Sequence, residues 1–174
     1  MYMRSFDPFI YQNVFHEYML EVKQDEIDTL HALLEDLPVT KEHEHDLGQR
    51  TLYGQENVLD IPGLVNLKKQ ITNILNVHNL LLTNNWAQLY NKNNQHTVHN
   101  HPSSVWSGIV YLNPSVASPT IFYDREFRHY THAFTKNQFL LFPSYIPHEV
   151  ARVNKDEQRL IISLNTKEKT NENT

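Results

Sequence analysis

Three histidines in the second half of the chain have the types and spacing of metal ligands. His99 and His101 stand one residue apart just before an apolar run, and His148 lies in the segment Phe142-Pro-Ser-Tyr-Ile-Pro-His-Glu-Val150. Because side chains alternate along a strand, two histidines one residue apart point to one face, where a third from a distant strand can complete a metal site. The chain has no cysteine, so His, Asp and Glu are the side chains that can hold a metal.

Iron(II) is one metal that such a set suits. A facial site of two histidines and one carboxylate leaves positions open for a bidentate co-substrate and dioxygen, and this chain offers His99, the residue two further on and His148. His96 is a weaker candidate, because alternation points it away from His99 unless a bulge intervenes. His43-Glu-His45 has the same His-x-His spacing, but it lies among charged residues in a predicted loop and not on a strand. We therefore expect no metal there.

Two amphipathic helices are predicted in the first half of the chain. Apolar residues recur at helical spacing over Glu26–Leu37, which Pro38 ends, and over Gly63–Val77. The polar stretch Lys41–Gln55 between them is predicted to be a loop. Upstream, Phe6–Phe15 alternates apolar and polar residues, which predicts a strand at the edge of a sheet.

Short apolar runs separated by Asn, Pro and Ser begin at Leu80 and are typical of an antiparallel sandwich or barrel. We expect a single domain over residues 1–174, with a helical part at about 1–79, a strand-rich core at about 80–165 and a frayed polar tail at 166–174. Trp86 and Trp106 are assigned to the core. The expected strands are Leu80–Tyr90, Val105–Leu112, Thr120–Tyr123, Gln138–Phe142, His148–Val153 and Arg159–Asn165.

Charge and composition exclude several classes of partner. The net charge of −5 and the pI near 6.1 argue against a dedicated binder of nucleic acid or of anionic membranes, because both need a basic face. The N-terminus lacks a basic segment followed by an apolar core, and no apolar run approaches the length of a membrane span. We therefore expect a cytoplasmic protein.

The second half of the chain resembles the 2-oxoglutarate- and Fe(II)-dependent oxygenases. Two stretches, residues 99–112 and 141–150, are more closely similar to a group of oxygenases from bacteria and phages that is related to the prolyl 4-hydroxylase-like branch. The similarity covers residues 80–165 well and reaches the N-terminal helices loosely. It implies a mainly β fold, the cupin-like double-stranded β-helix or jelly roll, with flanking helices. The matching features are Tyr90, His99-x-His101, Ser107–Asn113, His148 and Arg159.

The resemblance implies a role for each matching residue. His99 and His148 are the implied iron ligands, and Arg159 is implied to pair with the far carboxylate of 2-oxoglutarate. Tyr90 matches a tyrosine that donates its hydroxyl to the same carboxylate in prolyl hydroxylase relatives. Neutral imidazole suits Fe(II), and a planar guanidinium can bind a carboxylate through two parallel hydrogen bonds.

The chain departs from the family pattern at two positions. His101 stands where relatives carry an Asp or Glu ligand, and Ile161 stands where many relatives carry a serine. A neutral imidazole in place of a carboxylate makes the site more positive, which changes its hold on the metal. Three-histidine iron sites occur in the cupin-like cysteine dioxygenases. Either His101 is the third ligand, or Asp124 supplies a carboxylate in its place, or the metal is bound weakly.

The resemblance thus implies an Fe(II)- and 2-oxoglutarate-dependent oxygenase, a hydroxylase acting on a small molecule or a protein. Two alternatives stay open. One is a three-histidine dioxygenase that does not use 2-oxoglutarate, and the other is a non-catalytic jelly-roll binding module. An oligomer is compatible with all three.

Overall fold

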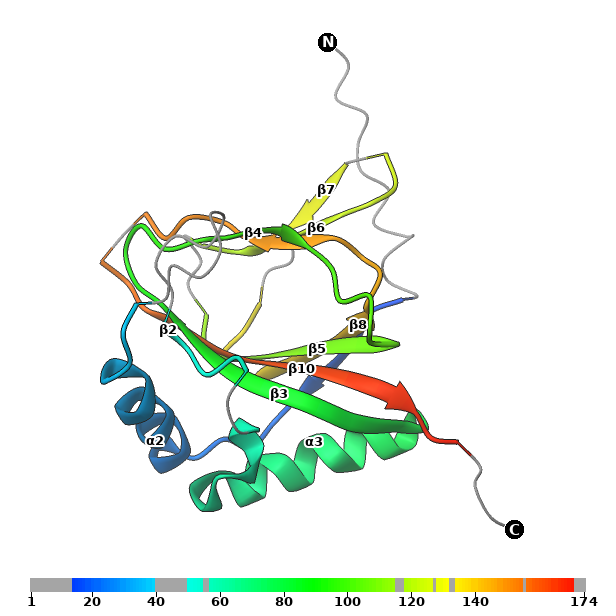
Figure 1. Cartoon of the computed structure of the whole chain (residues 1–174), viewed down its shortest axis with the longest axis horizontal. Helices are drawn as coiled ribbons and strands as arrows, with labels where there is room; N and C mark the ends of the chain where they lie inside the picture. The colour runs from blue at the N-terminus through cyan, green and yellow to red at the C-terminus, as the bar shows by residue number, and fades with distance from the viewer. Residues whose placement is uncertain are drawn as a thin grey trace.

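Two antiparallel sheets lie face to face, and two helices cover the outer face of the larger one (Figure 1). The computed structural model describes residues 14–39, 50–54, 57–114, 118–126, 128–131, 134–154 and 156–170. Within these residues the major sheet has the strand order β1-β8-β5-β10-β3-β2, and the minor sheet has the order β4-β9-β6-β7. Every pair of neighbouring strands is antiparallel. The predicted jelly roll is therefore confirmed.

The elements have the following bounds. The helices are α2 (Gln24–Glu35) and α3 (Val65–Val77), with short 3-10 turns η1 (Val58–Asp60) and η2 (Pro62–Leu64) before α3. The strands of the major sheet are β1 (His16–Met19), β2 (Arg50–Thr51), β3 (Leu80–Tyr90), β5 (Trp106–Asn113), β8 (Gln138–Pro143) and β10 (Arg159–Glu168). Those of the minor sheet are β4 (His96–His99), β6 (Thr120–Tyr123), β7 (His129–Thr131) and β9 (His148–Val150).

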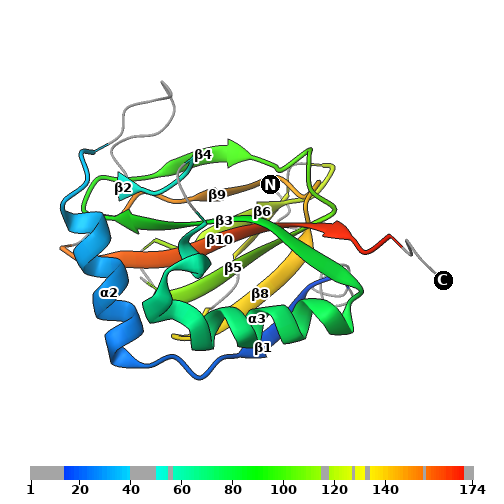
Figure 2. The same cartoon turned by 60° about the horizontal axis from the view of Figure 1, so that its bottom comes forward.

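Helices α2 and α3 lie on the same side of the major sheet (Figure 2). The Glu26 side chain explains why α2 begins where it does, because it accepts a hydrogen bond from the backbone N–H of Lys23 at 2.9 Å. Its other oxygen accepts from the backbone N–H of Leu67 at 3.1 Å, which links α2 to α3. Glu26 is buried, and these two hydrogen bonds satisfy its carboxylate. In the described part of the chain, neither helix has the length and apolar character to span a membrane.

Strand alternation divides the interior into two cores. On β10, Leu160 and Ile162 pack with the helices, whereas Ile161 packs with aromatic residues between the two sheets. The space between the sheets is therefore lined by every second residue of the long strands. Separately, Gly108 is required in β5, because a Cβ there would lie 2.5 Å from the Phe139 ring and 2.9 Å from Leu164.

Most predicted elements are confirmed, and the differences have local causes. Strand β10 continues to Glu168 where a frayed tail was expected from Thr166, because Thr166 is buried and its hydroxyl donates to the carbonyl of Trp106 at 2.8 Å. Strand β2 lies inside the predicted loop Lys41–Gln55, and the short strands β4 and β7 were not predicted. Most of the predicted strand Phe6–Phe15 lies outside the described residues.

Candidate metal centre

The His99, His101 and His148 side chains meet between the two sheets. Each offers one possible ligand atom, and these atoms lie within 4.8 Å of one another. The ring centroids of His99 and His148 are 4.3 Å apart, and that of His101 lies 5.3 and 5.2 Å from them. In the described part of the chain this is the group with the spacing of a metal site, and it contains no carboxylate.

His99 and His148 are held by matching contacts. They are Cα partners across β4 and β9. The Nδ1 atom of His99 lies 2.8 Å from the carbonyl of Thr97, and that of His148 lies 3.1 Å from the carbonyl of Ile146. A carbonyl can only accept, so each Nδ1 donates and each Nε2 keeps a lone pair for a metal.

His101 is placed differently from the sequence expectation. The expectation put His99 and His101 on one strand, but β4 ends at His99 and His101 lies in the following turn, just before Pro102. The His101 backbone N–H donates to the carbonyl of Ser144 at 3.0 Å, whereas no described residue hydrogen-bonds to its ring. The Trp86 ring lies 6.0 Å from it. The three imidazoles converge because the turn brings His101 back, not because of alternation.

Burial favours the neutral form of His101 and His148. Burial and, to a smaller extent, the neighbouring His99 lower the pKa of His101 to about 4. Burial also holds the pKa of His148 well below its usual range, together with the nearby His99 and His101. Neutral imidazole is the form that ligates a metal, so these two residues have the protonation state that metal binding needs.

His96 also faces the site, contrary to the expectation from alternation. The pairing of β4 with β9 shifts register between His96 and His99, as a bulge does. The two rings stack at 3.9 Å with an interplanar angle of 13°. The Nδ1 atom of His96 lies 3.4 Å from the Tyr90 hydroxyl.

Arg159 lies on the major sheet and is buried, with 1% of its surface exposed. One of its terminal N–H groups donates to the carbonyl of Ser118, and the other donates to the Thr120 hydroxyl at 2.5 Å. Its Nε–H has no hydrogen-bond partner among the described residues. Its guanidinium carbon lies 5.8 and 5.6 Å from the ring centroids of Tyr90 and Tyr111.

A buried cation of this kind needs a counter-charge. Within the described residues no Asp or Glu forms an ion pair with Arg159. Burial lowers the pKa of Arg159, which is the direction expected when a cation is removed from water without an acid beside it. An unpaired buried charge costs several kcal/mol, on the order of 3–5 when its partner is removed. An anionic ligand at this position would supply the missing partner.

The hydroxyl groups around Arg159 were not identified from the sequence. Thr120 accepts from Arg159 and also lies 2.9 Å from the Tyr111 hydroxyl. Both are fully buried. Nothing in the sequence around Thr120 distinguishes it from any residue that opens a strand, so only the pairing of distant strands reveals this contact.

The remaining sequence candidates do not join the group. Asp124, the alternative carboxylate, accepts hydrogen bonds from the backbone N–H groups of Glu126 at 2.8 Å and Arg128 at 2.9 Å, and from the Arg128 side chain at 2.6 Å. It lies outside the three-histidine group. His43 and His45 fall outside the described residues.

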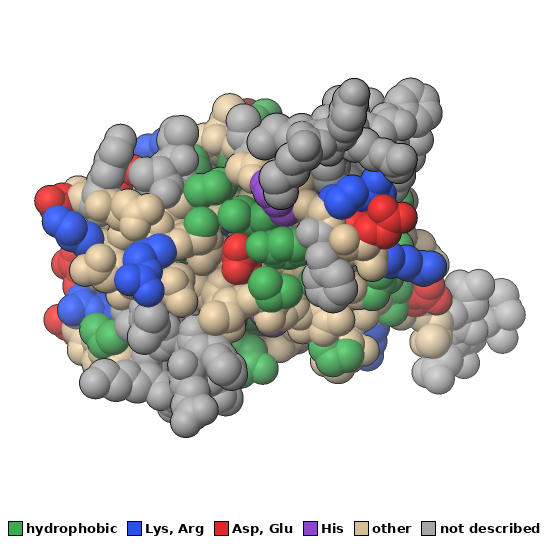
Figure 3. All heavy atoms as spheres, turned by 90° about the horizontal axis from the view of Figure 1, so that it is seen from above, with side chains coloured by type: hydrophobic (Ala, Val, Ile, Leu, Met, Phe, Trp, Pro, Cys, Tyr) green, Lys and Arg blue, Asp and Glu red, His purple; other side chains and the backbone are tan. Residues whose placement is uncertain are grey.

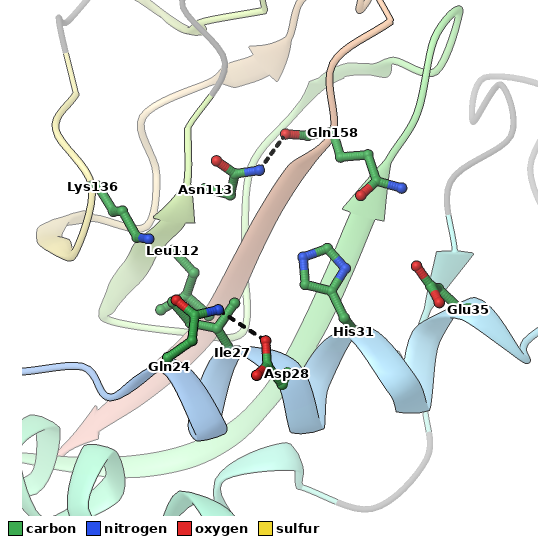
Figure 4. A pocket seen from close by; sticks show the side chains of 9 residues that line it. All are labelled: Gln24, Ile27, Asp28, His31, Glu35, Leu112, Asn113, Lys136 and Gln158. Atoms are coloured by element: carbon green, nitrogen blue, oxygen red, sulfur yellow. Dashed lines mark hydrogen bonds between the residues drawn. The ribbon is translucent and has the colours of Figure 1, made fainter.

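A separate cleft of about 400 Å³ lies between α2 and the ends of β5 and β10 (Figure 4). Its polar lining includes His31 and Asp28 of α2 and Lys136. These residues belong to no group with metal-ligand spacing. The cleft is therefore distinct from the histidine group.

Apolar side chains are exposed over the minor sheet, as Figure 3 shows for the face seen from above. Val98 of β4 is 48% exposed, and Tyr145, in the turn before β9, is 65% exposed. The histidine strands thus lie near the surface, whereas Arg159 lies deep in the major sheet.

No known family model matches the sequence, and no curated protein matches it significantly. Solved structures do match the fold. A prolyl hydroxylase from Trichoplax adhaerens, in complex with a peptide fragment of the hypoxia inducible factor oxygen degradation domain, is similar with a TM-score of 0.68 and 14% identity, over 91% of this chain and 86% of that one.

Two bacterial structures are similar to a comparable extent. A 2OG-Fe(II) oxygenase family oxidoreductase from Burkholderia pseudomallei has a TM-score of 0.64 and 13% identity, over 90% of this chain and 85% of that one. HygX from Streptomyces hygroscopicus, with nickel, 2-oxoglutarate and hygromycin B bound, has a TM-score of 0.64 and 12% identity, over 91% and 84% of the two chains. The chain therefore has the jelly-roll fold that these 2-oxoglutarate oxygenases share.

Proposed function

We propose that this protein is an Fe(II)- and 2-oxoglutarate-dependent oxygenase that hydroxylates a small molecule or a protein. The observation that carries the proposal is a buried arginine without an acidic partner among the described residues, between the same two sheets as three clustered histidines. The fold agrees, because similar structures contain 2-oxoglutarate together with a metal.

The residues present fit both Fe(II) and 2-oxoglutarate. Three imidazole nitrogens are donors that suit Fe(II) and leave coordination positions for further ligands. The free Nε–H of Arg159 suits a carboxylate, which a guanidinium binds through parallel charge-assisted hydrogen bonds. A dicarboxylate with one end at Arg159 and its other end toward the histidines satisfies both requirements.

Each residue has a distinct task in this mechanism. His99, His101 and His148 hold the metal through ring nitrogens, and backbone carbonyls fix the rings of His99 and His148. Arg159 binds the far carboxylate, and the Tyr90 hydroxyl donates to it. Iron and 2-oxoglutarate, when bound, would supply oxidising chemistry in which 2-oxoglutarate loses CO₂, one oxygen atom of O₂ enters the resulting succinate and the other enters a C–H bond of the substrate.

The interior between the sheets excludes water from this chemistry. Phe122 and Phe142 of the inter-sheet core have ring centroids 5.7 and 5.0 Å from that of His148. Low polarity around the site strengthens the attraction between Arg159 and an anion. It also protects reactive species from side reactions with solvent.

Anaerobic titration tests the proposal. Fe(II) followed by 2-oxoglutarate should produce a weak visible charge-transfer band, and admission of air should release succinate. Metal uptake without the band or any response to 2-oxoglutarate would instead favour a three-histidine dioxygenase, an alternative that the all-histidine donor set supports. Absence of both metal uptake and the band would favour a binding module.

A further inference from the structure

His96 contacts both the three-histidine group, through His99, and the residues around Arg159, through Tyr90. Its ring stacks on that of His99, with centroids 3.9 Å apart, and its Nδ1 lies 3.4 Å from the Tyr90 hydroxyl. The register shift in β4 is what allows His96 and His99 to lie on the same side. His96 therefore contacts one implied metal ligand and one implied co-substrate ligand.

Tyr90 continues this series of contacts to Arg159. The two residues are Cα partners across β3 and β10, and the guanidinium carbon lies 5.8 Å from the Tyr90 ring centroid. The contacts thus run from Arg159 through Tyr90 and His96 to His99. They cross from the major sheet to the minor sheet, two sheets that no strand pairing joins within the described residues.

We infer that His96 is a positioning residue that links the anion-binding half of the site to the metal-binding half, an inference that rests on the proposed function. Its stack restricts rotation of the His99 ring, so the Nε2 of His99 stays directed at the metal. Its contact with Tyr90 holds the hydroxyl in place. At 3.4 Å this hydrogen bond is long and weak; with a proton on Nδ1, His96 donates to the Tyr90 oxygen and leaves the hydroxyl hydrogen for the carboxylate.

The two contacts can be separated by substitution. His96→Phe keeps a flat ring that can stack on His99 but removes the atom that contacts Tyr90. His96→Gln keeps a polar group but removes the aromatic stack. A direct comparison is Tyr90→Phe, which removes the same hydrogen bond from its other side.

Calorimetry measures the two effects independently of turnover. Ni(II) alone is titrated into metal-free protein, and 2-oxoglutarate is then titrated into the Ni(II)-loaded protein. For His96→Phe we expect Ni(II) affinity within about twofold of the unaltered protein and 2-oxoglutarate affinity weaker by up to about tenfold, but no weaker than in Tyr90→Phe, which also loses the hydroxyl that contacts the carboxylate. The double variant should match Tyr90→Phe, because His96 acts on 2-oxoglutarate through the Tyr90 hydroxyl.

His96→Gln should show the opposite pattern, with Ni(II) binding about tenfold weaker and a smaller change in 2-oxoglutarate binding. His31→Phe on α2 is the matched control and should change neither affinity. If both affinities fall together in each His96 variant, or if neither falls, the positioning role is wrong. If the unaltered protein binds neither Ni(II) nor 2-oxoglutarate, the proposed function itself fails, and the linking role fails with it.

Discussion

The two sheets contribute to the site in different ways. The minor sheet supplies histidines from short strands, β4 with four residues and β9 with three, whose pairing is irregular. The major sheet supplies Arg159 from β10, which has ten residues and is paired on both sides, with β3 and β5. The proposed anion-binding half is thus built into a long strand of the larger sheet, whereas the proposed metal-binding half lies in a smaller sheet near the surface.

This difference suits the proposed chemistry. A co-substrate that is the same in every turnover benefits from a buried, preorganised anchor. The substrate, in contrast, must reach the metal from outside. The turn that carries His101 is more accessible than Arg159, since His101 is only partly buried. The following predictions test whether the two halves can be disrupted separately.

The largest effect is expected from removing a histidine that is anchored on the minor sheet. His148→Ala should weaken Ni(II) or Fe(II) binding by more than about 100-fold, because loss of the partners around a ligand alone costs about 10–100-fold. Equilibrium dialysis with metal analysis measures this. Unchanged metal content in His148→Ala would place the metal elsewhere.

Removing the arginine should disrupt the other half alone. Arg159→Gln should weaken 2-oxoglutarate binding by about 100-fold, because charge-assisted hydrogen bonds contribute about 1.5–3 kcal/mol each. Metal affinity should stay within about twofold, since Arg159 is not in the histidine group. Arg159→Lys keeps the charge without the planar fork and should be intermediate. Equal loss of metal and 2-oxoglutarate binding in Arg159→Gln would show that the halves are not separable.

A smaller effect is expected at His101, which lacks the backbone anchor of the other two histidines. His101→Ala should weaken metal binding by about tenfold, less than His148→Ala does. His101→Asp, which introduces the carboxylate seen in the wider family, should bind metal at least as well as the unaltered protein. Metal titrations followed by absorbance of the Co(II)-loaded protein compare these variants. A loss as large as that of His148→Ala would contradict the expected order.

The smallest effect is a dependence of stability on pH in the metal-free protein. The pKa values of His101 and His148 are lowered on folding, to about 4 for His101, so the unfolded chain binds more protons below its histidine pKa of about 6.5. Stability should therefore be greatest above about pH 6.5 and fall toward pH 4. Urea unfolding midpoints at pH 7.5 and 5.0 measure this. His101→Gln should make stability depend less steeply on pH. An equally steep dependence in this variant would show that the lowered pKa of His101 is not its cause.

Periodic patterns explain which parts of the fold could be predicted. The apolar periods of α2 and α3 are long and regular, so burial of one face determines them. Strand β4 could not be predicted, because its four residues include two histidines and its pattern is broken by a bulge. Strand β10 extends past its apolar run because Thr166 hydrogen-bonds to Trp106 across the sheet.

The site residues, like the strands, could be predicted from the sequence only in part. His99, His148 and Arg159 stood out because their residue types are uncommon beside apolar runs, and the fold brings the two histidines face to face. His96 was only the weaker candidate and Thr120 did not stand out, since their positions depend on strand pairing between distant segments. Sequence spacing alone also gave the wrong local structure at His101, which reaches the group from a turn.

A crystal structure of the protein soaked anaerobically with Mn(II) and 2-oxoglutarate tests the central claim most directly. We predict a metal bound by the Nε2 atoms of His99 and His148 and by the ring of His101, with the far carboxylate of 2-oxoglutarate on Arg159. A metal bound by Asp124, or a carboxylate away from Arg159, would contradict it.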